Sequence, residues 1–297
     1  MPLTKLEKLV RSGQYAQGMR EFLALEKESL TPGQLGFAYH CVSVCQYQTD
    51  KIFPALEYAK RAEEQAILAG NDVLLGRIWS NLIACCMDIG DTHLAVEYGE
   101  KWLANIDRFP ELRSQTAKVH FNLAQTFRVR KEFSRMFEHF DLGMTYIGDM
   151  PVSLRVHFHQ VYAWCLYSHE RIAEGDFQAQ RAGELVEESD VEGIREHLLL
   201  KGYRAYQMGD VQNAMHICEE FIVPDAPTTK RQEFWALWMI GMAACDFGNF
   251  EHGMAISALT LDLATSIKHS EFINRASELR RRAYRLGTLH SGDDPAG

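Results

Sequence analysis

The chain has 297 residues and a formal net charge of −9 at pH 7, with 46% hydrophobic and 24% charged residues. This composition is that of a folded protein and excludes a disordered chain, while the acidic balance disfavours general attraction to nucleic-acid phosphate. No stretch approaches the roughly 18 to 20 uninterrupted apolar residues of a membrane span, and charges stand where a signal peptide would need an apolar run. We therefore expect a cytoplasmic protein with no membrane partner.

Apolar residues recur at i, i+3, i+4 and i+7 along the chain, which predicts helices and no strands. The first predicted helix pair covers residues 3–28 and turns at Gly13, and the second covers residues 34–69. The next pairs are 73–89 with 92–106, 111–130 with 132–146, 152–168 with 171–188, 191–207 with 211–223, and 230–247 with 250–267. A proline-containing loop over 224–229 precedes the last pair. A final arginine-rich helix over 272–286 is expected to cap the array, and residues 291–297 are expected to be disordered.

A short turn recurs between the two helices of each pair, clearest in Ile89-Gly90-Asp91. The seven turn residues, called anchors below, are Gly13, Asp50, Gly90, Lys131, Glu170, Gly209 and Gly248. Subtracting successive positions gives spacings of 37 to 41 residues. Self-similarity at a fixed period indicates a solenoid, in which one helix pair cannot bury its apolar face alone. We expect a single domain over residues 1–290.

The residues around the anchors resemble those of the tetratricopeptide repeat. In the third unit they are Trp79, Leu82, Gly90 and Ala95, and in the last two units Gly202 and Gly241 occupy the site of close helix approach. The usual repeat has about 34 residues, whereas most spacings here are 39 to 41. Such long repeats are similar to those of bacterial peptide-pheromone receptors and related regulators, without the DNA-binding helix-turn-helix of some members.

This resemblance implies an all-α, right-handed superhelical α-solenoid of about seven helix pairs plus the capping helix. The first helix of each pair would line a concave groove that holds a peptide or protein segment. Asn81 and Asn122 stand at equivalent places, and an asparagine amide can bond a peptide backbone of any sequence. Arg77, Lys118 and Arg128 would hold a carboxylate, such as a peptide C-terminus, by charge-assisted hydrogen bonds.

Positions 2, 3, 6, 10 and 13 residues before each anchor are expected to face the groove. The remaining candidate binding residues are His40, Tyr47, Gln125, Gln160, Trp164, Tyr167, Tyr203, Tyr206, Trp235 and Trp238. Aromatic, arginine and glutamine side chains are typical of surfaces that anchor a partner. The alternative is that these rings pack between helices as core, and that the basic residues form a solvated face neutralised by Asp88 and other acids.

Catalytic and metal-binding patterns are absent from the sequence. No phosphate loop, dinucleotide fingerprint or nucleophile elbow occurs, and His157 and His159 would point to different faces of a helix. Seven cysteines without CxxC spacing indicate small core residues in a reducing compartment.

We therefore expect a non-catalytic binding module without cofactor or metal, whose partner is a peptide or protein rather than nucleic acid. Two alternatives stay open. One is an intracellular receptor for a short signalling peptide that regulates a partner protein or transcription. The other is a homo-oligomeric scaffold, of which a homodimer is the simplest form.

Overall fold

A computed structural model describes residues 2–222, 229–267 and 270–291 of the chain. Within these ranges the secondary structure is α-helix and short 3-10 helix, and no strand occurs, which confirms the all-α prediction. The expected loop at 224–229 lies outside the described residues except for Thr229, as does the expected tail except for Ser291. The chain packs as two compact units, Met1–Met150 and Pro151–Gly297.

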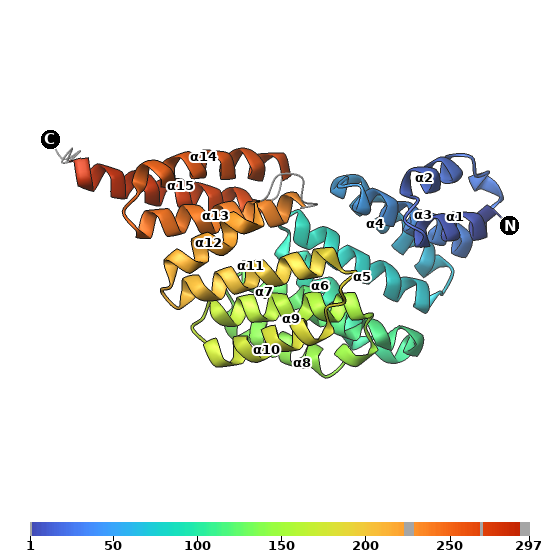
Figure 1. The fold of residues 1–297 in the computed structure, drawn as a ribbon. Helices are drawn as coiled ribbons and strands as arrows, with labels where there is room; N and C mark the ends of the chain where they lie inside the picture. Colours follow the sequence, from blue (N-terminus) through green and yellow to red (C-terminus); the bar gives the residue numbers. More distant parts are fainter. Residues whose placement is uncertain (1, 223–228, 268–269, 292–297) are drawn as a thin grey trace. The chain divides into compact units, whose positions relative to one another are not determined.

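The first unit is a stack of four helix pairs (Figure 1). Each helix packs on the next one along the chain, and the first helices of neighbouring pairs also pack on one another, as in tetratricopeptide repeats. The helices are α1 (Pro2–Arg11), α2 (Tyr15–Leu23), α3 (Pro32–Gln48), α4 (Ile52–Leu68), α5 (Asp72–Asp88), α6 (Thr92–Ala104), α7 (Thr116–Val129) and α8 (Phe133–Met144). Four 3-10 segments join them: η1 (Lys27–Ser29), η2 (Ile106–Arg108), η3 (Pro110–Gln115) and η4 (Ile147–Asp149).

The second unit repeats this plan with three helix pairs and a final helix. The helices are α9 (Val152–Tyr167), α10 (Ile172–Leu185), α11 (Val191–Gln207), α12 (Val211–Phe221), α13 (Lys230–Asp246), α14 (Phe250–Ile267) and α15 (Ser270–Ser291). The last helix packs on α13 and α14, buries Phe272, Ala276 and Leu279, and exposes Arg280 and Arg281. This arrangement is the one expected of a terminal helix that covers an apolar face.

All seven anchors adopt left-handed backbone conformations, with φ between 58° and 81°. In the third pair the N–H of Gly90 donates to the carbonyl of Met87, and the N–H of Asp91 donates to the carbonyl of Cys86. This is the Schellman arrangement, which satisfies the free carbonyls at the end of a helix and turns the chain into the next helix. The period read from the sequence therefore marks the turn inside each pair.

Equivalent positions on neighbouring first helices contact one another, so the repeats stack in phase. In the second unit His157 Nδ1 lies 3.1 Å from a carboxylate oxygen of Glu196, and the ring centroids of Trp164 and Tyr203 are 3.9 Å apart. Both pairs are separated by 39 positions in the sequence. All seven cysteines are buried free thiols, as predicted.

One helix boundary differs from the prediction for a physical reason. The helix expected over 111–130 begins only at Thr116, because η3 carries Leu112 down onto α5. Phe109 and Leu112 are almost fully buried there, and a Cβ on Gly76 would lie only 2.7 Å from Leu112. The tight 3-10 turn brings this apolar segment against Gly76, which has no side chain to obstruct it. A regular α-helix beginning at residue 111 would not place the segment there.

Candidate functional site

Three basic side chains stand on successive first helices of the first unit, and two of them act electrostatically on the third. We call His40 on α3, Arg77 on α5 and Lys118 on α7 the basic cluster. Burial, followed by the charges of Arg77 and Lys118, lowers the pKa of His40 to about 4, so His40 is neutral at pH 7. Lys118 is exposed, yet the protein around it desolvates its ammonium group and lowers its pKa.

Among the described residues, the two cations of the basic cluster lack acidic partners. No hydrogen bond or ion pair joins Arg77 or Lys118 to another residue within the described part of the chain, although the protein as a whole carries a charge of −9. Most surface arginines elsewhere in this unit are matched, for example Arg108 by Asp72 at 2.6 Å. Uncompensated positive charge on a partly enclosed surface favours an anionic ligand.

Two buried amides on α7 follow the basic cluster. Asn122 and Gln125 are 6% and 8% exposed, and neither Asn122 Nδ2 nor Gln125 Nε2 has a hydrogen-bond partner among the described residues. The carbonyl oxygen of Gln125 accepts a bond of 2.9 Å from Arg128 Nε, which orients the amide. A buried donor without a partner costs about 1–3 kcal/mol, so both amides are poised to donate to an acceptor.

The two asparagines at equivalent sequence positions differ in their contacts. Asn81 Nδ2 donates to the hydroxyl of Ser43 at 2.6 Å, and that hydroxyl donates to the carbonyl of Ala55 at 2.7 Å. The amide nitrogen of Asn81 therefore holds α5 against the preceding pair. In contrast, the amide nitrogen of Asn122 has no such partner among the described residues.

A pocket of about 370 Å³ adjoins the basic cluster. Its walls include Leu3 of α1, Phe37 of α3, and Val73, Leu74 and Arg77 of α5. Arg77 thus belongs both to the pocket and to the basic cluster. Sequence reasoning missed the pocket, because it depends on where Leu3 of α1 falls beside α3 and α5.

In the second unit four predicted aromatic residues gather into one cluster. The Trp164 ring stacks on Tyr203 and lies 5.3 Å from Trp235, whose ring centroid is 5.8 Å from that of Trp238. Trp164 and Trp235 are half-buried, whereas Tyr203 and Trp238 are buried. The guanidinium of Arg275 lies 5.0 Å from the centre of the Trp235 ring, a cation–π contact. The cluster therefore combines core packing with two accessible rings.

Two other predicted groove residues lie in the interior of the second unit. Tyr167 is 1% exposed, and its hydroxyl donates to Asp176 at 2.9 Å. Gln160 is also 1% exposed, and its amide nitrogen donates to the carbonyl of Gly193 at 2.8 Å. In this structure both side chains join neighbouring helices.

The remaining candidates occupy the C-terminal ends of first helices. Tyr47 is half-buried at the end of α3. Tyr206 is half-buried near the end of α11, and its hydroxyl donates to Asp246 of α13 at 2.7 Å. The structure therefore places Tyr206 at a joint between two repeats of the second unit.

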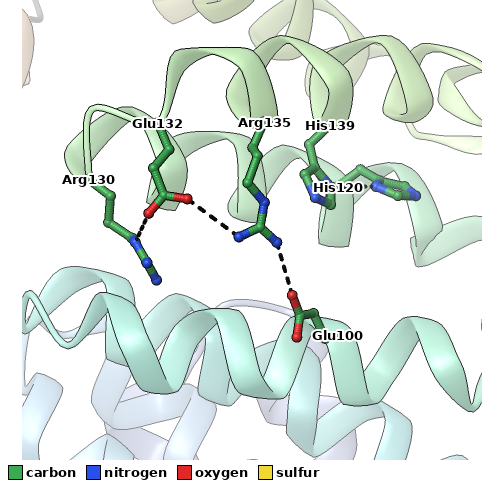
Figure 2. Close-up of polar contacts among 6 residues, drawn as sticks. All are labelled: Glu100, His120, Arg130, Glu132, Arg135 and His139. Atoms are coloured by element: carbon green, nitrogen blue, oxygen red, sulfur yellow. Dashed lines mark hydrogen bonds and ion pairs between the residues drawn. The ribbon is translucent and has the colours of Figure 1, made fainter.

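A polar network that the sequence analysis did not identify lies between α6, α7 and α8 (Figure 2). Arg135 of α8 contacts Glu132 at 3.4 Å and Glu100 of α6 at 3.0 Å, and Glu132 also pairs with Arg130 at 2.5 Å. This chain of ion pairs joins the third helix pair to the fourth. Because the acids and bases are matched, it does not mark a ligand site.

Beside it, His120 of α7 and His139 of α8 face one another, with their Nδ1 atoms 2.9 Å apart (Figure 2). Burial, and for His120 the charge on His139, lowers the pKa of each to about 4; the charge on Arg135 also lowers the pKa of His139. His120 lies 11 residues before the Lys131 anchor, and His139 lies 8 residues after it. The same offsets place Tyr39 against Tyr58 in the second pair, so the anchors could have revealed this contact.

Metal-binding and membrane-spanning features do not occur in the described residues. Nowhere within those ranges do three or more His, Cys, Asp or Glu side chains gather so as to hold a metal ion. No helix in the described part of the chain is both long and apolar enough to cross a membrane.

No protein-family model and no curated protein sequence matches this chain. Solved structures resemble it: NprR in complex with its cognate peptide NprX has 13% identity and a TM-score of 0.67, with 98% of this chain and 87% of NprR covered. A Rap protein complexed with competence and sporulation factor has 12% identity and a TM-score of 0.60, covering 99% of this chain and 98% of that one. A tetratricopeptide repeat protein from Parabacteroides merdae has 13% identity and a TM-score of 0.64, covering 95% and 97%. At these identities the likeness concerns the fold alone, which is a tetratricopeptide-like α-solenoid.

Proposed function

We propose that the chain is a non-catalytic module that binds a peptide or protein segment along the first helices of its helix pairs. The observation that carries this proposal is the set of unmatched donors on α5 and α7. Arg77 and Lys118 have no acidic partner within the described residues, and the buried amide nitrogens of Asn122 and Gln125 have no acceptor there. A peptide supplies what this surface lacks, because its backbone carbonyls accept from amides and its carboxylates pair with cations.

The accessible rings of the second unit support the same proposal. Trp164 and Trp235 are half-buried in a packed aromatic cluster, and rigid aromatic side chains are enriched where partners are anchored. We assign them to apolar side chains of the partner.

A second candidate function is a receptor for a short signalling peptide that regulates a partner protein. The observation that favours it is the fold, since the NprR structure contains its cognate peptide NprX and the Rap structure contains competence and sporulation factor. In this candidate, peptide binding would change how the chain engages its partner.

The test is selection from a random heptapeptide library displayed on phage, followed by fluorescence anisotropy with the selected peptides. We expect Asn122→Ala to weaken binding about five- to tenfold, because one hydrogen bond in a buried site contributes about 1–1.5 kcal/mol. Asn213→Ala, which changes an exposed asparagine of α12, is the matched control and should leave affinity unchanged. If the library yields no binder, or if selected peptides bind the Asn122 variant as well as the natural protein, this proposal is wrong.

A further inference from the structure

We infer that the pocket beside Arg77 binds a small organic phosphate, which has an apolar body and a phosphate monoester as its head. Such a ligand is distinct from the peptide of the proposed function, although Arg77 belongs both to this pocket and to the basic cluster. Three features of the first unit point to it: the hydrogen-bond donors of the pocket, the charge of Arg77, and the apolar part of the walls.

The side-chain amides of the pocket belong to Gln34 and Asn71. Gln34 Oε1 accepts a hydrogen bond of 3.0 Å from the backbone N–H of Thr31, at the start of α3. Asn71 Oδ1 accepts a hydrogen bond of 3.0 Å from the backbone N–H of Leu74, at the start of α5. Neither amide nitrogen has a hydrogen-bond partner among the described residues. Because the helix caps use the oxygen atoms, both amides present donors to a ligand.

The positive charge of Arg77 is not neutralised by the helices that form the pocket. The acids of α1, α3 and α5 are Glu7, Asp72 and Asp88. Glu7 pairs with Arg11 at 2.7 Å, Asp72 pairs with Arg108 at 2.6 Å, and Asp88 lies at the other end of α5. Arg77 forms no ion pair with a described residue. A cation beside two neutral donors favours an anion over an uncharged acceptor.

A phosphate monoester matches this set of donors. Its three terminal oxygens are strong acceptors, so one oxygen is available for each of the three donor side chains, Gln34, Asn71 and Arg77. The planar fork of the guanidinium is also suited to a phosphate group. A carboxylate has only two oxygens and would have to share one of them between two of these side chains.

The apolar part of the walls requires an organic body next to the phosphate. It consists of Leu3, Phe37, Val73 and Leu74. Leu3 and Phe37 are half-buried and pack against the core of the first unit, so they are held in place. Inorganic phosphate would leave this surface exposed to water, whereas a ring or a short alkyl chain on the phosphate covers it.

The volume limits the size of that body. Small-molecule sites in proteins commonly measure about 300–1,000 Å³, and this pocket, at about 370 Å³, is near the lower bound. The ligand is therefore a compact molecule, with a single ring or a short chain attached to its phosphate.

The experiment titrates the isotope-labelled protein, without any peptide, with phenyl phosphate, phenylacetate, benzyl alcohol and inorganic phosphate. The side-chain amide signals of Gln34 and Asn71, followed by NMR, report directly on the pocket. We expect phenyl phosphate to shift both signals until they saturate. Phenylacetate should bind about threefold more weakly, and benzyl alcohol and inorganic phosphate about tenfold more weakly, because they lack one oxygen, the charge and the ring, respectively.

Two variants remove a donor and retain the helix caps. Asn71→Asp keeps an oxygen at the start of α5, where Asp91 and Asp190 cap α6 and α11 in the natural protein. Gln34→Glu keeps the capping box of α3. Each variant should bind phenyl phosphate about tenfold more weakly, because a donor is replaced by a like charge. Asn213→Asp, which adds the same charge at an exposed position of α12, is the matched control and should leave the affinity unchanged.

The outcomes separate this inference from the proposed function. If phenyl phosphate shifts neither signal, or if it binds Asn71→Asp and Arg77→Gln as tightly as the natural protein, the pocket assignment is wrong. If phenylacetate binds as tightly as phenyl phosphate, the phosphate head is wrong, and if inorganic phosphate does so, the apolar body is wrong. Because no peptide is present, each of these results leaves the proposed peptide binding standing.

Discussion

Replacement of His139 by glutamine should make the protein markedly more resistant to mild acid. In the natural protein His139 shares a short contact with His120, and Arg135 lies beside it (Figure 2). The replacement has a natural precedent at the same offsets in the next repeat, where His159 Nδ1 lies 2.7 Å from the side-chain oxygen of Gln178. The variant should therefore keep the hydrogen bond and lose only the second titrating ring.

The magnitude follows from the depressed pKa. In the unfolded chain His139 titrates near 6.5, whereas in the folded protein burial and then Arg135 lower its pKa to about 4. Between these values the unfolded chain binds a proton that the folded protein does not, so stability falls as the pH falls from about 6.5 towards 4. At about 1.4 kcal/mol per pH unit, His139 alone removes about 2–3 kcal/mol between pH 7.5 and 4.5. Above pH 6.5 the variant and the natural protein should differ little.

The assay is hydrogen exchange of amides in α7 and α8, measured by mass spectrometry at pH 7.5 and 4.5 after correction for the intrinsic exchange rate. It reports on the fourth helix pair directly and does not require the whole chain to unfold in one step. His216→Gln, which changes an exposed histidine of α12, is the control. If His139→Gln and His216→Gln lose the same opening free energy between the two pH values, the electrostatic reasoning about the histidine pair is refuted.

Two further predictions concern backbone conformation and close packing, and both are measured by urea denaturation. Lys131→Gly should stabilise the protein by about 1 kcal/mol, because Lys131 has a φ of 60°, a left-handed conformation that glycine adopts more readily. Gly209→Ala should destabilise the protein by about 1 kcal/mol for the same reason, although no atom lies within 4 Å of the added Cβ. Equal effects of the same sign would contradict this reasoning. Gly99→Ala should destabilise by about 1–3 kcal/mol despite the better helix propensity of alanine, because the new Cβ would lie 2.4 Å from the fully buried Leu123. An unchanged midpoint would show that this contact relaxes freely.

The repeat period of the sequence predicted the helix pairs. A turn must separate the two helices of each pair, and few residue types readily adopt the positive φ that this turn requires. Asp50 and Glu170 lack the glycine signature, yet their positions in the period identified them, and both adopt positive φ. The equivalent positions on first helices, such as Trp164 and Tyr203, likewise followed from the period. What repeats along the chain could be predicted from the sequence.

Features that depend on how one repeat is rotated against the next could not be predicted. Asn81 and Asn122 occupy equivalent positions, but only Asn81 meets a serine, because Ser43 happens to stand opposite it. The pocket near Arg77 depends in the same way on where Leu3 falls across two other helices. The candidate residues His40, Arg77 and Lys118 came from the period alone, whereas their function as binding residues stays a prediction.

The place of Leu3 has a practical consequence for any immobilised assay. Since Leu3 of α1 forms one wall of the pocket, a tether or fusion partner joined to the start of α1 would lie beside Leu3 and obstruct the pocket. A sensor surface that carries the protein through α1 should therefore report weaker binding at this pocket than the free protein shows in solution.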